Sequence, residues 1–300
     1  MDVYDNELPD RDLDPRLRGG SPERLPLADE YVGEPRPVRR RILLPAVLFV
    51  ATCASTYQGR GLAFAAALMF ILTTHELGHF IQAVRYRVPT SLPIFLPMPF
   101  SPIGTMGAVI AMQAHVGNRK ALYDIGISGP LAGLVPALAC SIIGLRLSEV
   151  VPVDGRQALS LGEPLLFKLL SLLTLGPLDE SQAVFLHPLA YAGWVGIFIT
   201  GLNLIPIGQL DGGHVLYALL LRRAHRVATF MLFAAVVAVA VFGYWGWSVM
   251  LLLLFLMGAK HPPTADDNVP LGTGRIILGW LTLAFVVVGF TPQPFYLVGR

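Results

Sequence analysis

The chain has 300 residues, of which 54% are hydrophobic and 14% are charged. Soluble domains carry about a quarter charged residues, so this balance argues against an ordinary soluble protein and indicates a membrane protein. The net charge of +2 is too small for a basic nucleic-acid-binding surface, and we expect no nucleic-acid partner.

Residues 1–41 hold ten of the 20 acidic residues, eight of the 22 basic residues and six prolines. Such a segment cannot bury enough apolar surface to offset the entropy lost on ordering. We therefore predict a disordered tail over 1–41. It ends with Arg39, Arg40 and Arg41, directly before the first apolar run.

Apolar runs long enough to approach a membrane span recur along the rest of the chain, since a spanning helix needs about 20 such residues. They lie at 42–58, 62–84, 121–145, 185–205, 227–243, 245–259 and 275–291. The expected fold is an all-α polytopic membrane protein with six or seven transmembrane helices. Basic residues gather in alternate loops, nine against five, which predicts a cytoplasmic N-terminus.

Residues 88–118 do not fit a simple span. Prolines interrupt the first half, and Gly104-Thr-Met-Gly107-Ala-Val-Ile-Ala-Met-Gln113 reads as a short extended segment after glycine turns. Non-helical backbone at membrane depth is tolerated where protein or a water-filled cavity satisfies its polar groups. We predict a re-entrant, β-like segment that lines a cavity.

The strongest motif is His75-Glu76-Leu77-Gly78-His79, inside the second apolar run. A spacing of four residues places His75 and His79 on one face of a helix, one turn apart, where both imidazoles can bind one Zn²⁺. Glu76 lies beside them as a general base for a water molecule. Two imidazoles and a carboxylate are costly in lipid, so this position requires a function.

Catalytic zinc sites usually have three protein ligands, and a second motif offers the third. In Asn203-Leu-Ile-Pro206-Ile-Gly-Gln-Leu210-Asp211-Gly212-Gly213 the proline breaks the helix and the glycines allow close backbone approach. We predict that Asp211 is the third ligand. The alternative is that Asp211 only caps the helix that follows.

The two motifs together resemble the site-2 protease family of intramembrane zinc metalloproteases, and Gly129-Pro130-Leu131-Ala132-Gly133 resembles a glycine-rich core helix of that family. The resemblance covers about 62–222 as a catalytic core within a membrane-embedded protease domain over 42–300. It implies one Zn²⁺ per chain on His75, His79 and Asp211, with Glu76 as base and Asn203 at the reacting carbonyl.

The same resemblance makes 104–113 a strand that pairs with an unwound substrate, with Gly104, Gly107, Ala108 and Ile110 as substrate-binding residues. It implies membrane-protein substrates that carry a transmembrane helix. The closing stretch, from His261-Pro262-Pro263 to Thr291-Pro292, resembles bacterial members. We therefore expect a multi-pass protein of a bacterial inner membrane, without PDZ or CBS domains.

Four polar residues near the motifs are interpreted as structural. Asp124 is expected to start a helix at the interface, near Arg119 and Lys120. His214 has a supporting role near the site, His115 lies in a solvated loop, and His261 is interfacial.

Two other classes of protein fit some of these features. A transporter with broken helices also places carboxylates and metal ions at membrane depth, but it does not explain a glutamate between two histidines. A non-catalytic relative would bind membrane proteins without cutting them, and it would not need Glu76.

Overall fold

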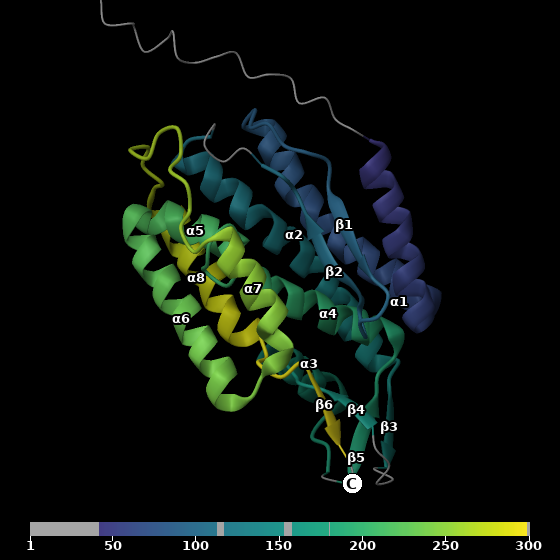
Figure 1. Ribbon diagram of the computed structural model, residues 1–300. Coiled ribbons are helices and arrows are strands. Elements are labelled where there is room, and N and C mark those ends of the chain that lie inside the picture. The colour runs from purple at the N-terminus through teal and green to yellow at the C-terminus, as the bar shows by residue number, and fades with distance from the viewer. Residues whose placement is uncertain (1–41, 113–116, 153–157, 180, 299–300) are drawn as a thin grey trace, which may run out of the picture. The chain divides into compact units, whose positions relative to one another are not determined.

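The computed structural model describes residues 42–112, 117–152, 158–179 and 181–298. The predicted tail over 1–41 lies outside these residues. The described chain is mostly helical, with short strands between the helices (Figure 1). The described residues all belong to one compact unit, Val38–Arg300.

Helix α1 (Leu43–Arg85) is two helices joined at a break. Arg60 has φ −149° and ψ 15°, and Gly61 has φ +80° and ψ −177°, so neither residue is helical. Unbroken, 43 residues would be about 65 Å long, twice the roughly 30 Å of a bilayer core. The two limbs, 43–59 and 62–85, match the first two predicted spans, and the chain turns back between them (Figure 1).

The remaining predicted apolar runs also form helices. They are α2 (Arg119–Arg146), α4 (Pro188–Asn203), α6 (Ala224–Phe242), α7 (Ser248–Met257) and α8 (Thr273–Gly289). Two shorter helices lie between them, α3 (Leu165–Leu175) and α5 (Asp211–Leu220), and the second is the helix expected after Asp211. Short 3₁₀ turns, η3 (Leu221–Arg223) and η4 (Trp245–Trp247), precede α6 and α7.

Three helical stretches of the described chain are long and apolar enough to cross a membrane: Leu43–Arg85, Arg119–Arg146 and Asp211–Phe242. The last contains a change of direction at Leu221, where φ is +52°. Helices α3, α7 with its preceding turn, and α8 are apolar but shorter. The expected six or seven spans therefore stay a prediction.

The described residues are mostly helical, as expected, but they also form three two-stranded antiparallel sheets, more than the one β-like segment predicted. Strands β1 (Ile94–Met98) and β2 (Gly104–Val109) form a hairpin, of which only the second strand was expected. Strand β3 (Glu149–Pro152) pairs with β5 (Gln182–Phe185), and β4 (Ala158–Leu161) pairs with β6 (Phe295–Val298). The partners in these two sheets are far apart in sequence, and periodicity in each segment alone does not reveal them.

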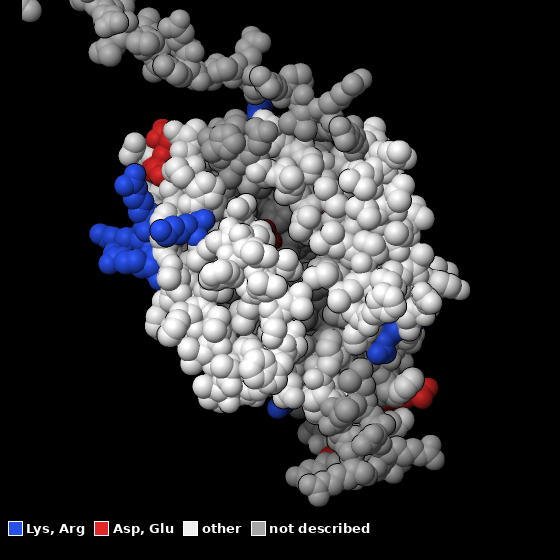
Figure 2. All heavy atoms as spheres, in the orientation of Figure 1, with Lys and Arg blue, Asp and Glu red and all other residues white. Residues whose placement is uncertain are grey.

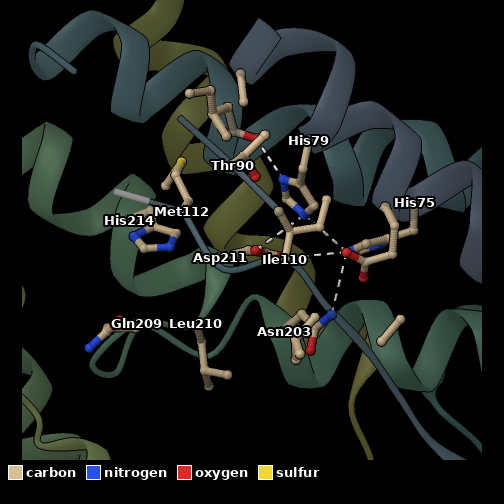
Figure 3. Close-up of a pocket in the computed structure, with 15 residues that line it drawn as sticks. His75, His79, Thr90, Ile110, Met112, Asn203, Gln209, Leu210, Asp211 and His214 are labelled. Atoms are coloured by element: carbon tan, nitrogen blue, oxygen red, sulfur yellow. Dashed lines mark hydrogen bonds and ion pairs between the residues drawn. The ribbon is translucent and has the colours of Figure 1, made fainter. Parts of the chain in front are cut away.

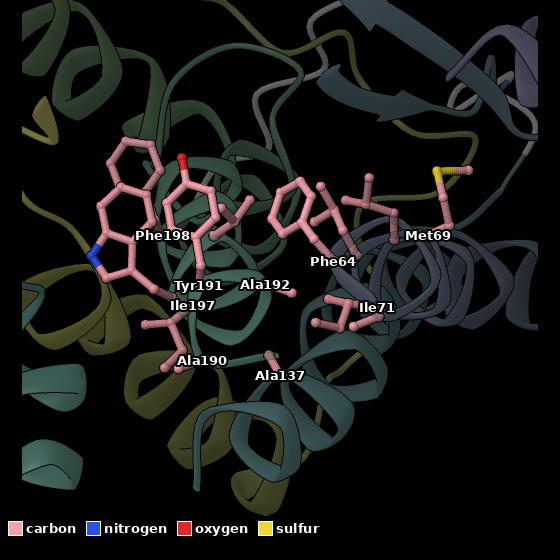
Figure 4. Packing of buried hydrophobic residues seen from close by; sticks show 14 of the residues in the cluster. Phe64, Met69, Ile71, Ala137, Ala190, Tyr191, Ala192, Ile197 and Phe198 are labelled. Carbon is pink, nitrogen blue, oxygen red and sulfur yellow. The ribbon is translucent and has the colours of Figure 1, made fainter. Parts of the chain in front are cut away.

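The core is built around α4, which packs against α1 and α2. The side chains of Trp194, Tyr191 and Phe64 are almost completely buried. Tyr191 stacks on Phe64, with ring centroids 5.0 Å apart (Figure 4). It also stacks on Trp194, with ring centroids 5.8 Å apart. This aromatic stack fixes α4 against the second limb of α1, which carries the histidine motif.

The outside of the helices is apolar. Phe230, Phe233, Phe255 and Leu281 on α6, α7 and α8 are each more than 60% exposed. In the face shown in Figure 2, charged residues gather at the margins and leave the middle almost uncharged. Contact between so much exposed apolar surface and water is unfavourable, whereas contact with lipid is favourable. The chain is a membrane protein.

Candidate metal centre

The second limb of α1 places the histidine motif inside the protein. His75 and Glu76 are each 4% exposed, and His79 is 8% exposed. The Nε2 atoms of the two histidines lie 3.2 Å apart, as the helical spacing predicted. Both rings therefore point to one place beside the helix.

Asp211 is brought to the same place by the break between α4 and α5. Its Oδ2 lies 3.2 Å from Nε2 of His75, and its Oδ1 lies 3.3 Å from Nε2 of His79. Asp211 is the first residue of α5, whose N-cap position is Leu210. The carboxylate thus faces the two histidines, so the geometry favours the ligand interpretation over a helix cap (Figure 3).

These three side chains fit a zinc ion. The candidate ligand atoms all lie within 4.8 Å of one another, and they are the only such group found among the described residues. Two imidazole nitrogens and one carboxylate oxygen are a donor set that zinc enzymes use, with a fourth position left for water or substrate. The residues could hold one Zn²⁺ at this position.

Helix α2 orients His79. The Nδ1 atom of His79 donates a hydrogen bond of 2.7 Å to the carbonyl oxygen of Ile125. Since a carbonyl only accepts, Nδ1 carries the proton and Nε2 keeps its lone pair for a metal. Gly129 makes this approach possible, because a Cβ atom there would lie 2.0 Å from Nε2 of His79. This contact gives the glycine-rich segment of α2 a physical role.

Glu76 and Asn203 face the same cavity. Both line it, and Nδ2 of Asn203 lies 3.4 Å from Nε2 of His75. Glu76 has no hydrogen-bond partner among the described residues. Every fully buried side-chain oxygen of these residues has a partner, so the Glu76 oxygens are not fully buried. The Glu76 carboxylate is therefore open to the cavity, where it can accept a proton from water.

The hairpin forms one wall of the cavity. Of the four residues predicted to bind substrate, Ala108 and Ile110 line the cavity, whereas Gly104 and Gly107 do not. Gly104 instead packs on the first limb of α1, where Ser55 Oγ donates a hydrogen bond of 2.6 Å to its carbonyl. Substrate binding by these four residues stays a prediction.

The backbone of β2 has a free edge at the cavity. The Ala111 carbonyl accepts from the Ser91 N–H, and the Ala111 N–H donates to Ser91 Oγ. Both polar groups of Ala111 thus face the segment before β1. Among the described strands β2 pairs with β1 alone, so its other edge is free, and Ala108, Val109 and the following Ile110 line the cavity.

Several residues of the cavity were not expected. Thr90, Met112 and Gln209 also line the cavity; the position of Gln209 beside Asp211 was the one local signal for any of them.

Asp124 pairs with Arg275 of α8 rather than with Arg119 or Lys120. His261 is 4% exposed and contacts His214, so its side chain packs inside the protein beside the site. His115 lies outside the described residues.

Comparisons with known proteins agree with this geometry. Residues 63–243 match the model of "Peptidase family M50". The "Probable zinc metalloprotease EGY1, chloroplastic" of Arabidopsis thaliana is 32% identical over 77% of this chain, and EGY2 of the same plant is 30% identical over 80%. EGY3 of Oryza sativa is 31% identical over 74%. The chain spans 43% of the length of the first two relatives and 40% of the third. No solved structure gives a significant match.

Proposed function

The chain belongs to peptidase family M50 and is a zinc metalloprotease, and from this premise we propose that it cuts peptide bonds within or beside transmembrane segments of other membrane proteins. One observation supports the proposal above the others. The three candidate zinc ligands and Glu76 lie inside a bundle of apolar helices, so a substrate reaches them at membrane depth.

The mechanism assigns roles to five polar residues of the cavity. His75, His79 and Asp211 would hold the zinc ion, which would supply Lewis acidity to a water molecule and to the substrate carbonyl. Glu76 removes a proton from the attacking water and returns it to the nitrogen of the leaving amine. Asn203, whose amide lies 3.4 Å from His75, donates a hydrogen bond to the developing oxyanion.

The free edge of β2 positions the substrate. A transmembrane helix hides its carbonyls in its own hydrogen bonds, so the segment must unwind before it is cut. The unpaired edge of β2, with Ile110 just beyond it at the cavity, can then pair with the unwound segment as an added strand. Substrates with glycine, proline or polar residues in the membrane would unwind more easily.

The placement of the protein in the cell is part of the proposal. We infer a multi-pass protein of six or seven spans with a cytoplasmic N-terminus, on the basis of the loop charges. The curated relatives carry the word chloroplastic in their names, so a bacterial inner membrane has no support from them.

The experiment compares membrane proteomes of native cells that carry wild type, Glu76→Gln, or the control Glu149→Gln on exposed strand β3. Glu76→Gln removes the base and leaves the three zinc ligands. We expect one or a few uncut membrane-spanning fragments to accumulate in Glu76→Gln alone. Identical proteomes, with zinc bound and protein abundance equal, would contradict proteolysis and favour a transporter or a binding protein.

A further inference from the structure

His214 is a polar residue of the cavity that the proposed mechanism does not use. It lies on α5, one turn after Asp211, and its half-buried side chain lines the cavity. In Figure 3, His214 and Asn203 lie on opposite sides of Asp211, with Met112 next to His214. Polar groups thus flank the metal centre on both sides.

A chain of hydrogen bonds fixes the tautomer of His214. His261 Nδ1 lies 2.6 Å from the carbonyl oxygen of Pro262, which can only accept, so Nδ1 of His261 carries a proton. In the neutral ring, Nε2 of His261 is then an acceptor. It lies 2.7 Å from Nδ1 of His214, which must donate. The remaining nitrogen of His214, Nε2, is consequently an acceptor without a proton.

The environment of His261 keeps that ring neutral and in place. Burial lowers the pKa of His261 to about 4, although the hydrogen bond with Pro262 opposes this shift. The ring stacks on Tyr217 with centroids 4.7 Å apart, and the Nε2 of His225 lies 3.0 Å from the backbone carbonyl oxygen of His261. The Tyr217 hydroxyl donates to Asp267 at 2.8 Å. His261 is therefore a rigid acceptor for His214.

The Nε2 atom of His214 is available to a ligand. The described residues provide no hydrogen-bond partner for it. Every fully buried side-chain nitrogen of these residues has a partner, so Nε2 of His214 is not fully buried. Nε2 is therefore accessible from the cavity. A lone acceptor at this position needs a donor, and an extended polypeptide bound along the β2 edge offers main-chain N–H groups.

We propose that Nε2 of His214 accepts a hydrogen bond from a main-chain N–H of the bound substrate strand, and that His261 is the positioning residue that holds His214 in the required tautomer. This inference rests on the proposed function, because it concerns how the same site binds a peptide. It adds a second anchor for the substrate backbone, on the side of the metal centre opposite Asn203.

The test measures binding rather than cleavage. The probes are acetyl-Leu-Leu-hydroxamate, whose hydroxamate binds zinc, and two analogues in which an ester oxygen replaces one amide N–H in turn. Dissociation constants are measured for the zinc-loaded, detergent-solubilised full chain. In wild type, one ester should bind about tenfold more weakly than the amide, the cost of one hydrogen bond. In His214→Phe that difference should disappear, while zinc content stays equal to wild type.

A second pair of variants separates the hydrogen bond from folding. His261→Gln retains a side-chain oxygen that can accept from His214 Nδ1, and it should keep the ester penalty. His261→Phe keeps the ring but removes the acceptor, so the penalty should fall. An equal ester penalty in wild type and His214→Phe would overturn the inference. Two other results would also overturn it: loss of zinc from His214→Phe, and the absence of a penalty for either ester in wild type. Failure of the amide probe to bind wild type would overturn the proposed peptidase site as well.

Discussion

Arg275 of α8 holds Asp124 of α2 with two hydrogen bonds, 2.7 Å from Nε to Oδ1 and 3.0 Å from a terminal guanidinium nitrogen to Oδ2. The hydroxyl of Tyr86, which follows α1, also donates to Asp124. A single carboxylate thus links three helices that are separated in sequence. Ile125, which orients His79, is the next residue, so this ion pair also positions the backbone beside the metal centre.

Removing the cation from this pair should destabilise the protein. Loss of one partner of a buried pair costs about 3–5 kcal/mol, but the Arg275 side chain is 35% exposed, so we expect about 2 kcal/mol for Arg275→Met. The measurement is thermal unfolding in one detergent, with Arg223→Met on the exposed end of η3 as control. The double variant Asp124→Asn with Arg275→Met should cost less than the two single changes summed. Additive costs would mean that the pair is not coupled.

The candidate zinc ligands could be picked out from the sequence because their signals are local. His75, Glu76 and His79 lie within two turns of one helix, and Asp211 lies beside a proline break in an otherwise apolar run. The helices could be predicted equally well, because an apolar segment in a membrane must satisfy the hydrogen bonds of its own backbone, and a helix does so. The geometry then showed that the two motifs meet.

The partner of Asp124 and the pairing of β4 with β6 had no such local signal. Arg275 is 151 residues from Asp124, and many nearer cations offered equal charge. Strand β6 pairs with a segment more than 130 residues earlier. Contacts of this kind depend on how helices pack, and periodicity within one segment carries no information about them. The His214–His261 contact was missed for the same reason.

Loss of the carboxylate ligand should remove zinc without unfolding the chain. Asp211→Asn keeps the shape of the side chain but not its charge, so two imidazoles remain as strong donors. Zinc affinity should fall by more than the roughly 10–100-fold that loss of an outer hydrogen-bond partner costs. Mass spectrometry of metal content after dialysis measures this, with the exposed Asp179→Asn as control. Full zinc retention by Asp211→Asn would exclude Asp211 as a ligand.

A methyl group on Gly129 should disturb the metal centre from the neighbouring helix. The added Cβ would lie 2.0 Å from Nε2 of His79, whose ring the Ile125 carbonyl holds in place. We expect Gly129→Ala to weaken zinc binding at least about tenfold and to destabilise the protein by about 1–3 kcal/mol. Zinc titration and thermal unfolding measure the two effects.

Gly59→Ala is the matched control for that change, because nothing lies within 4 Å of a Cβ at position 59. It should leave zinc affinity unchanged and alter stability by no more than about 0.5 kcal/mol. Equal zinc affinity in Gly129→Ala and Gly59→Ala would show that α2 does not constrain His79.

Removing one N–H from the free edge of β2 should impair cleavage but not zinc binding. Ile110 follows β2 and lines the cavity, while the next residue, Ala111, bonds to Ser91, so we expect Ile110→Pro to delete a donor at the cavity and to leave the pairing of Ala111 with Ser91. We expect substrate cleavage to fall about 5- to 12-fold, with zinc content unchanged, since one backbone hydrogen bond to the substrate is worth about 1–1.5 kcal/mol. Ile110→Val keeps the N–H and a similar side chain, and it should cleave like wild type. The substrate for this test is a fragment that accumulates in Glu76→Gln cells. If Ile110→Pro and Ile110→Val cleave it at equal rates, the substrate does not pair with this edge.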